Sequence, residues 1–116
     1  STLCTRICLM HLLVLSCLLA AAAFVPAATA ADAAAGKKKA AACAVCHGLD
    51  GLSKNPDAPN LAGDSATYIV SQLKAFQAGT RQSEQMSIMA EGLSEDDIAN
   101  LAAWYSSIKV KVELPQ

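Results

Sequence analysis

The chain has 116 residues, of which 53% are hydrophobic and 16% are charged, and its formal net charge is −1. A chain of this length suggests one small domain. Because the net charge is close to zero and the lysines and arginines form no basic stripe, the sequence argues against a protein that binds nucleic acid.

The N-terminal segment carries most of the excess hydrophobicity. Arg6 precedes an almost wholly apolar run over residues 7–25, and Ala28-Thr29-Ala30 follows it. A positive start, an apolar centre and an A-x-A-like cleavage site are typical of a secretory signal peptide. We therefore predict that residues 1–30 are a signal peptide, that the domain comprises residues 31–116, and that the protein is periplasmic, with no membrane span after cleavage.

Membrane attachment is the alternative for this segment. The apolar run is close to the length of a membrane-spanning helix, so the N-terminal helix could remain uncleaved as an anchor. A lipid-modified Cys17 fits less well, because the apolar run continues past it. If residues 1–30 are removed, the remaining chain keeps two cysteines and one histidine, all within five residues.

Residues 31–42 are rich in alanine, the residue with the highest helix propensity, and they predict a short helix. Three consecutive lysines, Lys37, Lys38 and Lys39, lie within it. We interpret them as a solvated face of the helix, with a docking patch for an acidic partner as the alternative.

The stretch that follows, Cys43-Ala44-Val45-Cys46-His47, is the attachment motif of c-type haem. Each thiol can form a thioether with one vinyl group of the porphyrin. Two intervening residues on a helical turn bring both sulfurs to one edge of the haem, and the next imidazole can reach the iron. We predict that Cys43 and Cys46 attach one haem c and that His47 is its proximal axial ligand.

Two other interpretations of this motif are possible. A tetrahedral zinc site needs about four protein ligands, or three if it is catalytic. No other Cys or His remains after residue 30, so only carboxylates could complete such a site. Thiol–disulfide oxidoreductases also carry C-x-x-C, but on a βαβ pattern, and no strand-like alternation flanks Cys43.

Residues 48–63 predict a long loop, because they hold three glycines and two prolines and show no hydrophobic periodicity. A loop of this length in a small domain usually wraps a ligand or is functional. Here it would cover one face of a haem.

Residues 65–78 predict a helix. Ile69, Leu73 and Phe76 fall on one face at helical spacing, and the serine at the start of the segment can cap it. Gly79 stands where a left-handed residue commonly ends a helix.

Residues 80–92 are predicted to be a second loop, which contains Met86 and Met89. A methionine is often a gap-filling core residue. One histidine leaves the sixth coordination position of the iron open, however, and these two thioethers are the only soft side chains downstream. We therefore expect one of the two to bind the iron.

Residues 94–109 predict the clearest helix of the chain. Ser94 and Asp97 approximate a capping box, and Lys109 is placed to complement the negative C-terminal end. Trp104 borders the apolar stripe of this helix. The stripe follows the helical repeat and consists of Ile98, Leu101, Ala102, Tyr105 and Ile108. The tail after residue 109 is expected to be a loose end.

From about Gly36 to Ile108 the chain resembles the bacterial class I c-type cytochromes of the small monohaem kind. Four segments carry the resemblance: Cys43-Ala44-Val45-Cys46-His47-Gly48, Pro59-Asn60-Leu61-Ala62-Gly63, Gly79-Thr80-Arg81 and Met86-Ser87-Ile88-Met89 before Leu93-Ser94. The resemblance implies an all-α cytochrome c fold, in which three to four short helices wrap around one covalently attached haem. The N- and C-terminal helices would cross near Gly36 and Trp104.

The resemblance also implies further site residues. It selects Met86 over Met89 as the second axial ligand, because Met86 stands seven residues before Leu93. It implies that the carbonyl of Pro59 accepts the imidazole N–H of His47, a bond that fixes ring orientation. As a weaker implication, Arg81 would lie near a haem propionate.

The expected function follows from His–Met ligation. Both axial positions of the iron are filled, so we expect a non-enzymatic one-electron carrier that cycles between Fe(II) and Fe(III) and docks transiently on exported or membrane-bound redox partners. The alternative is a haem c subunit of a larger dehydrogenase complex. An open-iron enzyme or gas sensor would follow only if no methionine binds. Because related cytochromes also occur as two fused haem domains, a dimer is possible.

Overall fold

The computed structural model describes residues 30–116, so the predicted signal peptide lies, apart from Ala30, outside the described residues. In this range the chain forms helices and no strand, which confirms the all-α prediction. In chain order the elements are α2 (Ala33–Lys39), the 3₁₀ turn η1 (Ala40–Ala42), α3 (Ala44–His47), α4 (Ala66–Gln77), α5 (Glu84–Glu91) and α6 (Glu95–Ser107).

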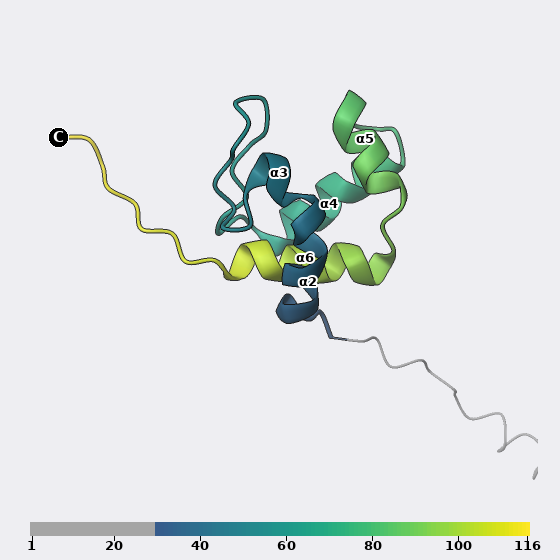
Figure 1. Ribbon diagram of the computed structural model, residues 1–116, viewed down its shortest axis with the longest axis horizontal. Coiled ribbons are helices and arrows are strands. Elements are labelled where there is room, and N and C mark those ends of the chain that lie inside the picture. Colours follow the sequence, from purple (N-terminus) through teal and green to yellow (C-terminus); the bar gives the residue numbers. More distant parts are fainter. Residues whose placement is uncertain (1–29) are drawn as a thin grey trace, which may run out of the picture.

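Helix α2 crosses α6 at close range, and this crossing is the scaffold of the domain (Figure 1). Gly36 is buried at the crossing, and a Cβ added there would collide with the carbonyl of Asn100 and lie 2.9 Å from Cβ of Trp104. Only a glycine lets the two backbones approach this closely. The crossing therefore lies where the family resemblance implied.

Helix α6 begins as predicted and ends earlier than predicted. The side chain of Ser94 accepts from the backbone N–H of Asp97, and the Asp97 side chain accepts from the N–H of Ser94, so the capping box is complete. The helix stops at Ser107 because Ile108 is extended, with φ −68° and ψ 124°. Lys109 thus lies outside the last helical turn, and its predicted role at the helix end is wrong.

Helix α4 packs across α6 and completes the core. It begins after Ser65, whose side chain accepts from the N–H of Tyr68, and Gly79 beyond its end is left-handed with φ 71°, both as predicted. The buried core cluster contains residues from η1, α4 and α6, namely Ala40, Ile69, Leu101, Ala102 and Tyr105. Such a small cluster supplies limited hydrophobic stabilisation.

The segment of residues 80–92 contradicts the loop prediction, because residues 84–91 form the helix α5. Ser83 caps its start by accepting from the N–H of Met86, and good helix formers without proline or glycine follow. The segment is only eight residues long and mostly exposed, so it lacks the periodic apolar stripe by which longer helices are recognised.

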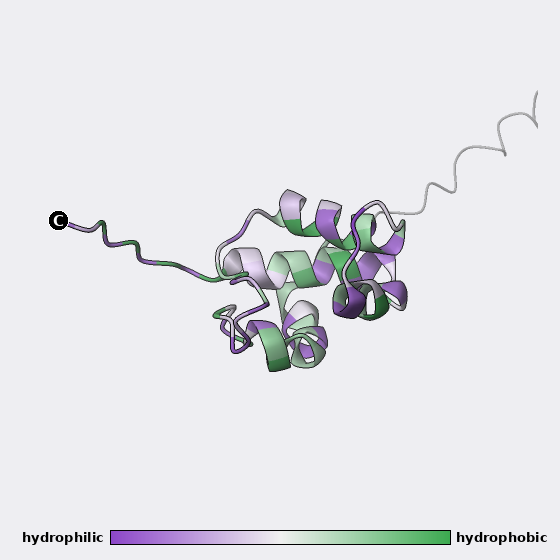
Figure 2. Cartoon of the chain, turned by 90° about the horizontal axis from the view of Figure 1, so that it is seen from above, coloured by the Kyte–Doolittle hydropathy of each residue, from purple (hydrophilic) through white to green (hydrophobic). Residues whose placement is uncertain are grey.

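The C-terminal tail runs away from the helices as an extended chain (Figures 1 and 2). Val110, Val112 and Leu114 alternate with polar residues along it and are 53%, 75% and 83% exposed. Among residues 30–116 there is no helix that combines the length and the apolar character needed to cross a bilayer.

Candidate haem-binding site

Helix α3 is a single turn that presents the C-x-x-C-H motif. The carbonyl of Cys43 accepts from the backbone N–H of Cys46 at 3.2 Å and from that of His47 at 2.9 Å. Both thiols are free and half-buried, whereas His47 is only 6% exposed. The turn therefore buries the imidazole while it keeps the two sulfurs one helical turn apart.

Gly48 turns the chain out of α3 and into the long predicted loop. Its φ is 74°, a left-handed conformation that few other residues adopt, and an added Cβ would also collide with the carbonyl of Leu52. Residues 48–63 contain no helix or strand, which confirms the loop prediction.

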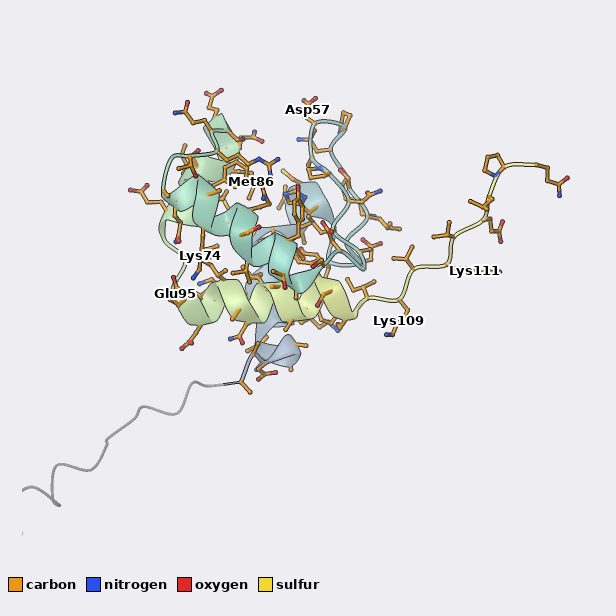
Figure 3. All side chains as sticks on the ribbon, turned by 180° about the vertical axis from the view of Figure 1, so that it is seen from behind. Asp57, Lys74, Met86, Glu95, Lys109 and Lys111 are labelled. Atoms are coloured by element: carbon orange, nitrogen blue, oxygen red, sulfur yellow. The ribbon has the colours of Figure 1, made fainter. Side chains whose placement is uncertain are left out.

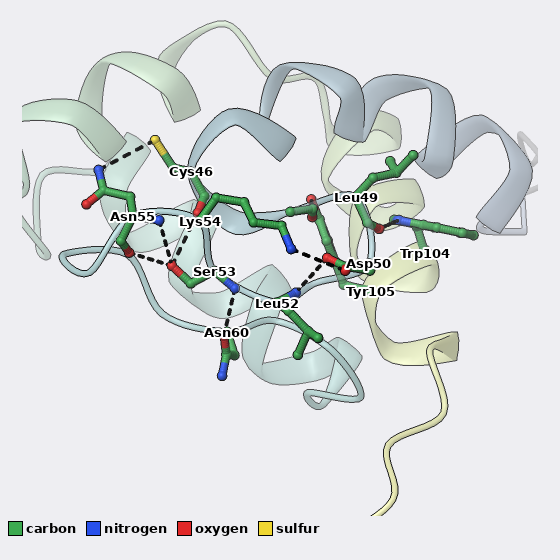
Figure 4. Close-up of polar contacts among 11 residues, drawn as sticks. Cys46, Leu49, Asp50, Leu52, Ser53, Lys54, Asn55, Asn60, Trp104 and Tyr105 are labelled. Atoms are coloured by element: carbon green, nitrogen blue, oxygen red, sulfur yellow. Dashed lines mark hydrogen bonds and ion pairs between the residues drawn. The ribbon is translucent and has the colours of Figure 1, made fainter.

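Short polar side chains hold this loop in one shape (Figure 4). The backbone N–H of Ser53 donates to Oδ1 of Asn60 at 2.7 Å, and its hydroxyl donates to the carbonyl of Cys46 at 3.2 Å. The N–H of Lys54 donates to the same carbonyl at 2.8 Å. These bonds fasten both arms of the loop to each other and to α3.

The loop brings the carbonyl of Pro59 to 2.9 Å from Nδ1 of His47. A carbonyl oxygen can only accept, so this contact places a proton on Nδ1, and in the neutral form of the ring Nε2 keeps its lone pair for a metal ion. The contact spans twelve residues of sequence and depends on the loop shape. It fixes the orientation of the ring, as a metal-ligating histidine requires.

A cavity of about 620 Å³ adjoins this imidazole. Pockets for cofactors commonly measure about 300–1,000 Å³ and are mainly apolar. The apolar and aromatic side chains of this lining include Leu61, Tyr68, Ile69, Leu73, Phe76, Ile88, Leu93, Leu101 and Tyr105. A cavity of this size and lining, with a thiol, an imidazole and thioethers at its walls, fits a haem.

The structure brings five of the six predicted site residues to this one cavity. They are Cys43, His47, Pro59, Arg81 and Met86. The sixth, Cys46, is half-buried outside the lining, and its sulfur lies 4.0 Å from Nδ2 of Asn55 (Figure 4).

Both candidate thioethers lie on α5 and line the cavity. Met86 is half-buried, on the side of α5 toward α3 (Figure 3), whereas Met89 is 45% exposed. In Figure 1, α3 and α5 stand apart above α6. The imidazole and the methionines thus approach the cavity from different elements.

Arg81 is held at the wall of the cavity by two neighbours on α4. Its guanidinium Nη1 donates to Oε1 of Gln72 at 2.6 Å, and its central carbon lies 4.7 Å from the ring centre of Phe76. Gln72 and Phe76 line the cavity as well. A fixed positive charge is therefore available there for an acidic group of a ligand.

Two observations bear on the zinc and thiol–disulfide interpretations of the motif. In the described part of the chain, no three His, Cys, Asp or Glu side chains gather in a way that could hold a metal ion. Burial raises the pKa of the Cys43 thiol, while the positive charge of Lys39 opposes the shift more weakly. Reactive redox thiols instead have a lowered pKa.

Sequence reasoning missed one contributor to the site. Tyr105 was assigned only to the core stripe, yet its hydroxyl donates to the carbonyl of Gly48 at 3.1 Å, directly after His47. Tyr105 is 1% exposed and also lines the cavity. A buried tyrosine needs a hydrogen-bond partner, but its spacing along the chain does not reveal which carbonyl accepts.

Burial, with smaller effects of the acidic groups Cys43 and Asp50, raises the pKa of Tyr105 to about 12. The folded state therefore holds this proton more tightly than the unfolded state, in which tyrosine has a pKa of about 10. The resulting stability is fully present below about pH 10 and is lost as the pH rises toward about 12. We expect Tyr105→Phe, which lacks this group, to be less stable than wild type at neutral pH by about 1–3 kcal/mol.

Denaturant titrations of both proteins from neutral pH to about pH 12 measure this difference. The difference in the free energy of unfolding between wild type and Tyr105→Phe should become smaller above about pH 10, because only the wild type loses the contribution of the tyrosine. A difference that stays constant over this range would show that Tyr105 does not titrate with a raised pKa.

Residues 33–109 match the family model described as Cytochrome c. Cytochrome c-554(548) of Halomonas halodenitrificans is 51% identical over 68 residues, which are 56% of this chain and 82% of that protein. The thiosulfate dehydrogenase electron acceptor of Thiomonas intermedia is 42% identical over 70 residues, which are 59% of this chain and 32% of that protein.

A solved structure shows the same fold. Reduced recombinant cytochrome c4 from Pseudomonas stutzeri superposes with a TM-score of 0.65 and 39% identity, over 72% of this chain and 48% of that one. The chain thus spans most of the Halomonas protein, about half of the cytochrome c4 chain and about a third of the Thiomonas protein.

Proposed function

The chain belongs to the cytochrome c family, and from this premise we propose that it carries single electrons between redox proteins through one haem c. Cys43 and Cys46 would hold the haem by thioether bonds, and His47 and Met86 would be its axial ligands. The family membership supports covalent haem c as the cofactor, and the four residue roles are part of the proposal.

The observation that carries the proposal is the setting of His47. This buried side chain is fixed through Nδ1 by Pro59, and it borders an apolar cavity of about 620 Å³. Met86 reaches the same cavity from α5. A neutral imidazole and a neutral thioether in one apolar cavity are the ligand pair of an electron-transfer haem.

Held by His47 and Met86, a haem would supply reversible one-electron oxidation and reduction and would offer no coordination site to a substrate. We therefore assign the chain no catalytic activity. The apolar walls of the cavity disfavour the additional positive charge of the oxidised state, and the soft thioether of Met86 acts in the same direction. Both effects raise the reduction potential. The guanidinium of Arg81 would offset the negative charge of a propionate.

Electron exchange with partners is proposed to take place beside the attachment motif. Val45, between the two cysteines, is 78% exposed, so the cofactor edge bound there would lie near the surface. Small, weak interfaces suit partners that must dissociate quickly after electron transfer. We propose that redox partners dock transiently around this point.

The test of the proposal is haem that stays attached after denaturation. Protein expressed with haem attachment is expected to be coloured and to give a c-type pyridine haemochrome spectrum. Mass spectrometry after denaturation should show the mass of the chain plus one haem, because thioether bonds survive unfolding. Folded protein that is colourless and has two free thiols would refute the proposal.

A second candidate function is that of a haem subunit or dedicated acceptor of a dehydrogenase. It is favoured by the 42% identity to the Thiomonas protein, which is described as a thiosulfate dehydrogenase electron acceptor. Size-exclusion chromatography of the native protein distinguishes the two functions. A stable complex with a catalytic chain supports the subunit, a freely migrating cytochrome supports the mobile carrier, and a pure dimer would show self-association.

Export remains part of the proposal. We propose that residues 1–30 are a signal peptide, that the domain starts near Ala31 and that the protein is periplasmic; an uncleaved membrane anchor is the alternative. We expect protein purified from the exported fraction to have an intact mass that begins near Ala31, plus one haem. A mass that retains residues 1–30 would instead indicate the anchor.

A further inference from the structure

Helix α5, which carries Met86, is only weakly held by hydrophobic burial. Ala90 is its one fully buried side chain, whereas Ile88 is 70% exposed and Met89 is 45% exposed. The helix packs mainly on α4, at one end of the molecule (Figure 1). A helix of two turns is only marginally stable without tertiary contacts, so the position of α5 must depend on contacts other than hydrophobic burial.

One such contact is made by Gln77, the last residue of α4. Its side-chain amide Nε2 donates to the carbonyl of Ala90 at 2.8 Å and to the carbonyl of Leu93 at 2.8 Å. The first carbonyl is near the C-terminal end of α5, and the second lies just before α6. Both amide hydrogens of this single side chain are therefore used to hold the end of α5.

The start of the same segment is also fastened to α4. The backbone N–H of Arg81 and the hydroxyl of Thr80 both donate to the carbonyl of Ala75, at 3.1 Å and 3.3 Å. Residues 79–93 thus leave α4 and are hydrogen-bonded back to its last turn at both ends. Met86 lies near the middle of this segment, so its distance from the cavity depends on both attachments.

We propose that Gln77 is a positioning residue that clamps α5 and thereby holds the thioether of Met86 at the haem cavity. This inference rests on the proposed function, because it assumes that Met86 is the axial ligand. Gln77 does not itself line the cavity, although one of its two partners, Leu93, does, and we infer that it acts by holding the C-terminal end of α5. Its effect should therefore appear in how often the thioether leaves the iron rather than in whether the haem is bound.

The test uses the haem-loaded full-length protein with Gln77→Ala and Gln77→Glu. An added ligand such as imidazole can bind ferric iron only after the thioether leaves, so its binding rate reports the opening of α5. Loss of the two hydrogen bonds in Gln77→Ala should raise this rate at least about fivefold, the lower end of what two hydrogen bonds contribute, because Gln77 is exposed to solvent. Gln77→Glu should raise the rate further, because its carboxylate faces two carbonyls that can only accept. Amide hydrogen exchange in α5 should accelerate by a similar factor.

Lys74→Ala is the matched control. Lys74 lies one turn earlier on α4 and forms an ion pair with Glu95 of α6, so its removal disturbs the same helix without touching α5 (Figure 3). In this variant the rate of imidazole binding and the rate of amide exchange in α5 should both stay within about twofold of wild type, as expected for the loss of an exposed ion pair.

Failure of the clamp and failure of the proposed ligation give different results. If the methionine–ferric absorption band is present but imidazole binding and α5 exchange are unchanged in both Gln77 variants, the clamp is refuted. If the wild type lacks that band, methionine ligation is refuted instead. In that case amide exchange alone decides on the clamp, with unchanged exchange counting against it.

Discussion

Replacement of both Cys43 and Cys46 by alanine is expected to leave the domain largely unfolded. Without covalent attachment, the cavity of about 620 Å³ beside the small core would lose the cofactor that fills it. Its apolar walls would then face water and lose the packing contacts that the haem provides. Because the whole stability of a small domain is only about 5–15 kcal/mol, we expect this loss to unfold it.

Far-ultraviolet circular dichroism and thermal melting of the double variant measure this effect. Val45→Ala is the control, because Val45 lies between the two cysteines and is 78% exposed, so its loss should change stability by less than about 0.5 kcal/mol. Native-like helical signal and a cooperative melt in the Cys43→Ala, Cys46→Ala variant would show that the helices fold without the haem.

Met86→Ala is expected to retain the haem and lose the methionine–ferric absorption band. The side chain of alanine has no atom that can bind iron, so a water molecule or an added ligand can occupy the sixth coordination position. The reduction potential should fall by a substantial part of the roughly 0.8 V range that axial ligands span. Reduced Met86→Ala should bind carbon monoxide rapidly at neutral pH, whereas the wild type should not.

Met89→Ala is the matched control for this prediction. Met89 lies on the same helix and lines the same cavity, but it is 45% exposed. Its removal should leave the absorption band and the potential close to those of the wild type. A variant pair with the opposite behaviour would assign the sixth position to Met89. A band retained in both single variants would show that each methionine can replace the other as ligand.

Local signals account for the parts of the fold that were predicted correctly. Ser94 with Asp97 specifies a helix start through contacts three residues apart, and Gly79 marks an end through its left-handed conformation. The motif at Cys43 lies within one helical turn, so its spacing is visible in the sequence. These features depend on neighbours in the chain, which is why they could be predicted without tertiary contacts.

The errors also have local causes. Residues 80–92 were predicted as a loop because a two-turn helix is too short to show periodicity, and α5 is stable only where it packs on α4. Lys109 was assigned to the end of a helix that stops at Ser107, a boundary that propensity alone places poorly.

The helical fold and the cytochrome c family can be predicted from the chain alone, since both depend on short-range patterns and one five-residue motif. The contacts that support the site could not be predicted in this way. The bonds of Tyr105 to Gly48, of Gln77 to Ala90 and of Arg81 to Gln72 join residues 57, 13 and 9 positions apart. Such partners are set by how the helices cross and where the loops close, and no local period in the chain encodes them.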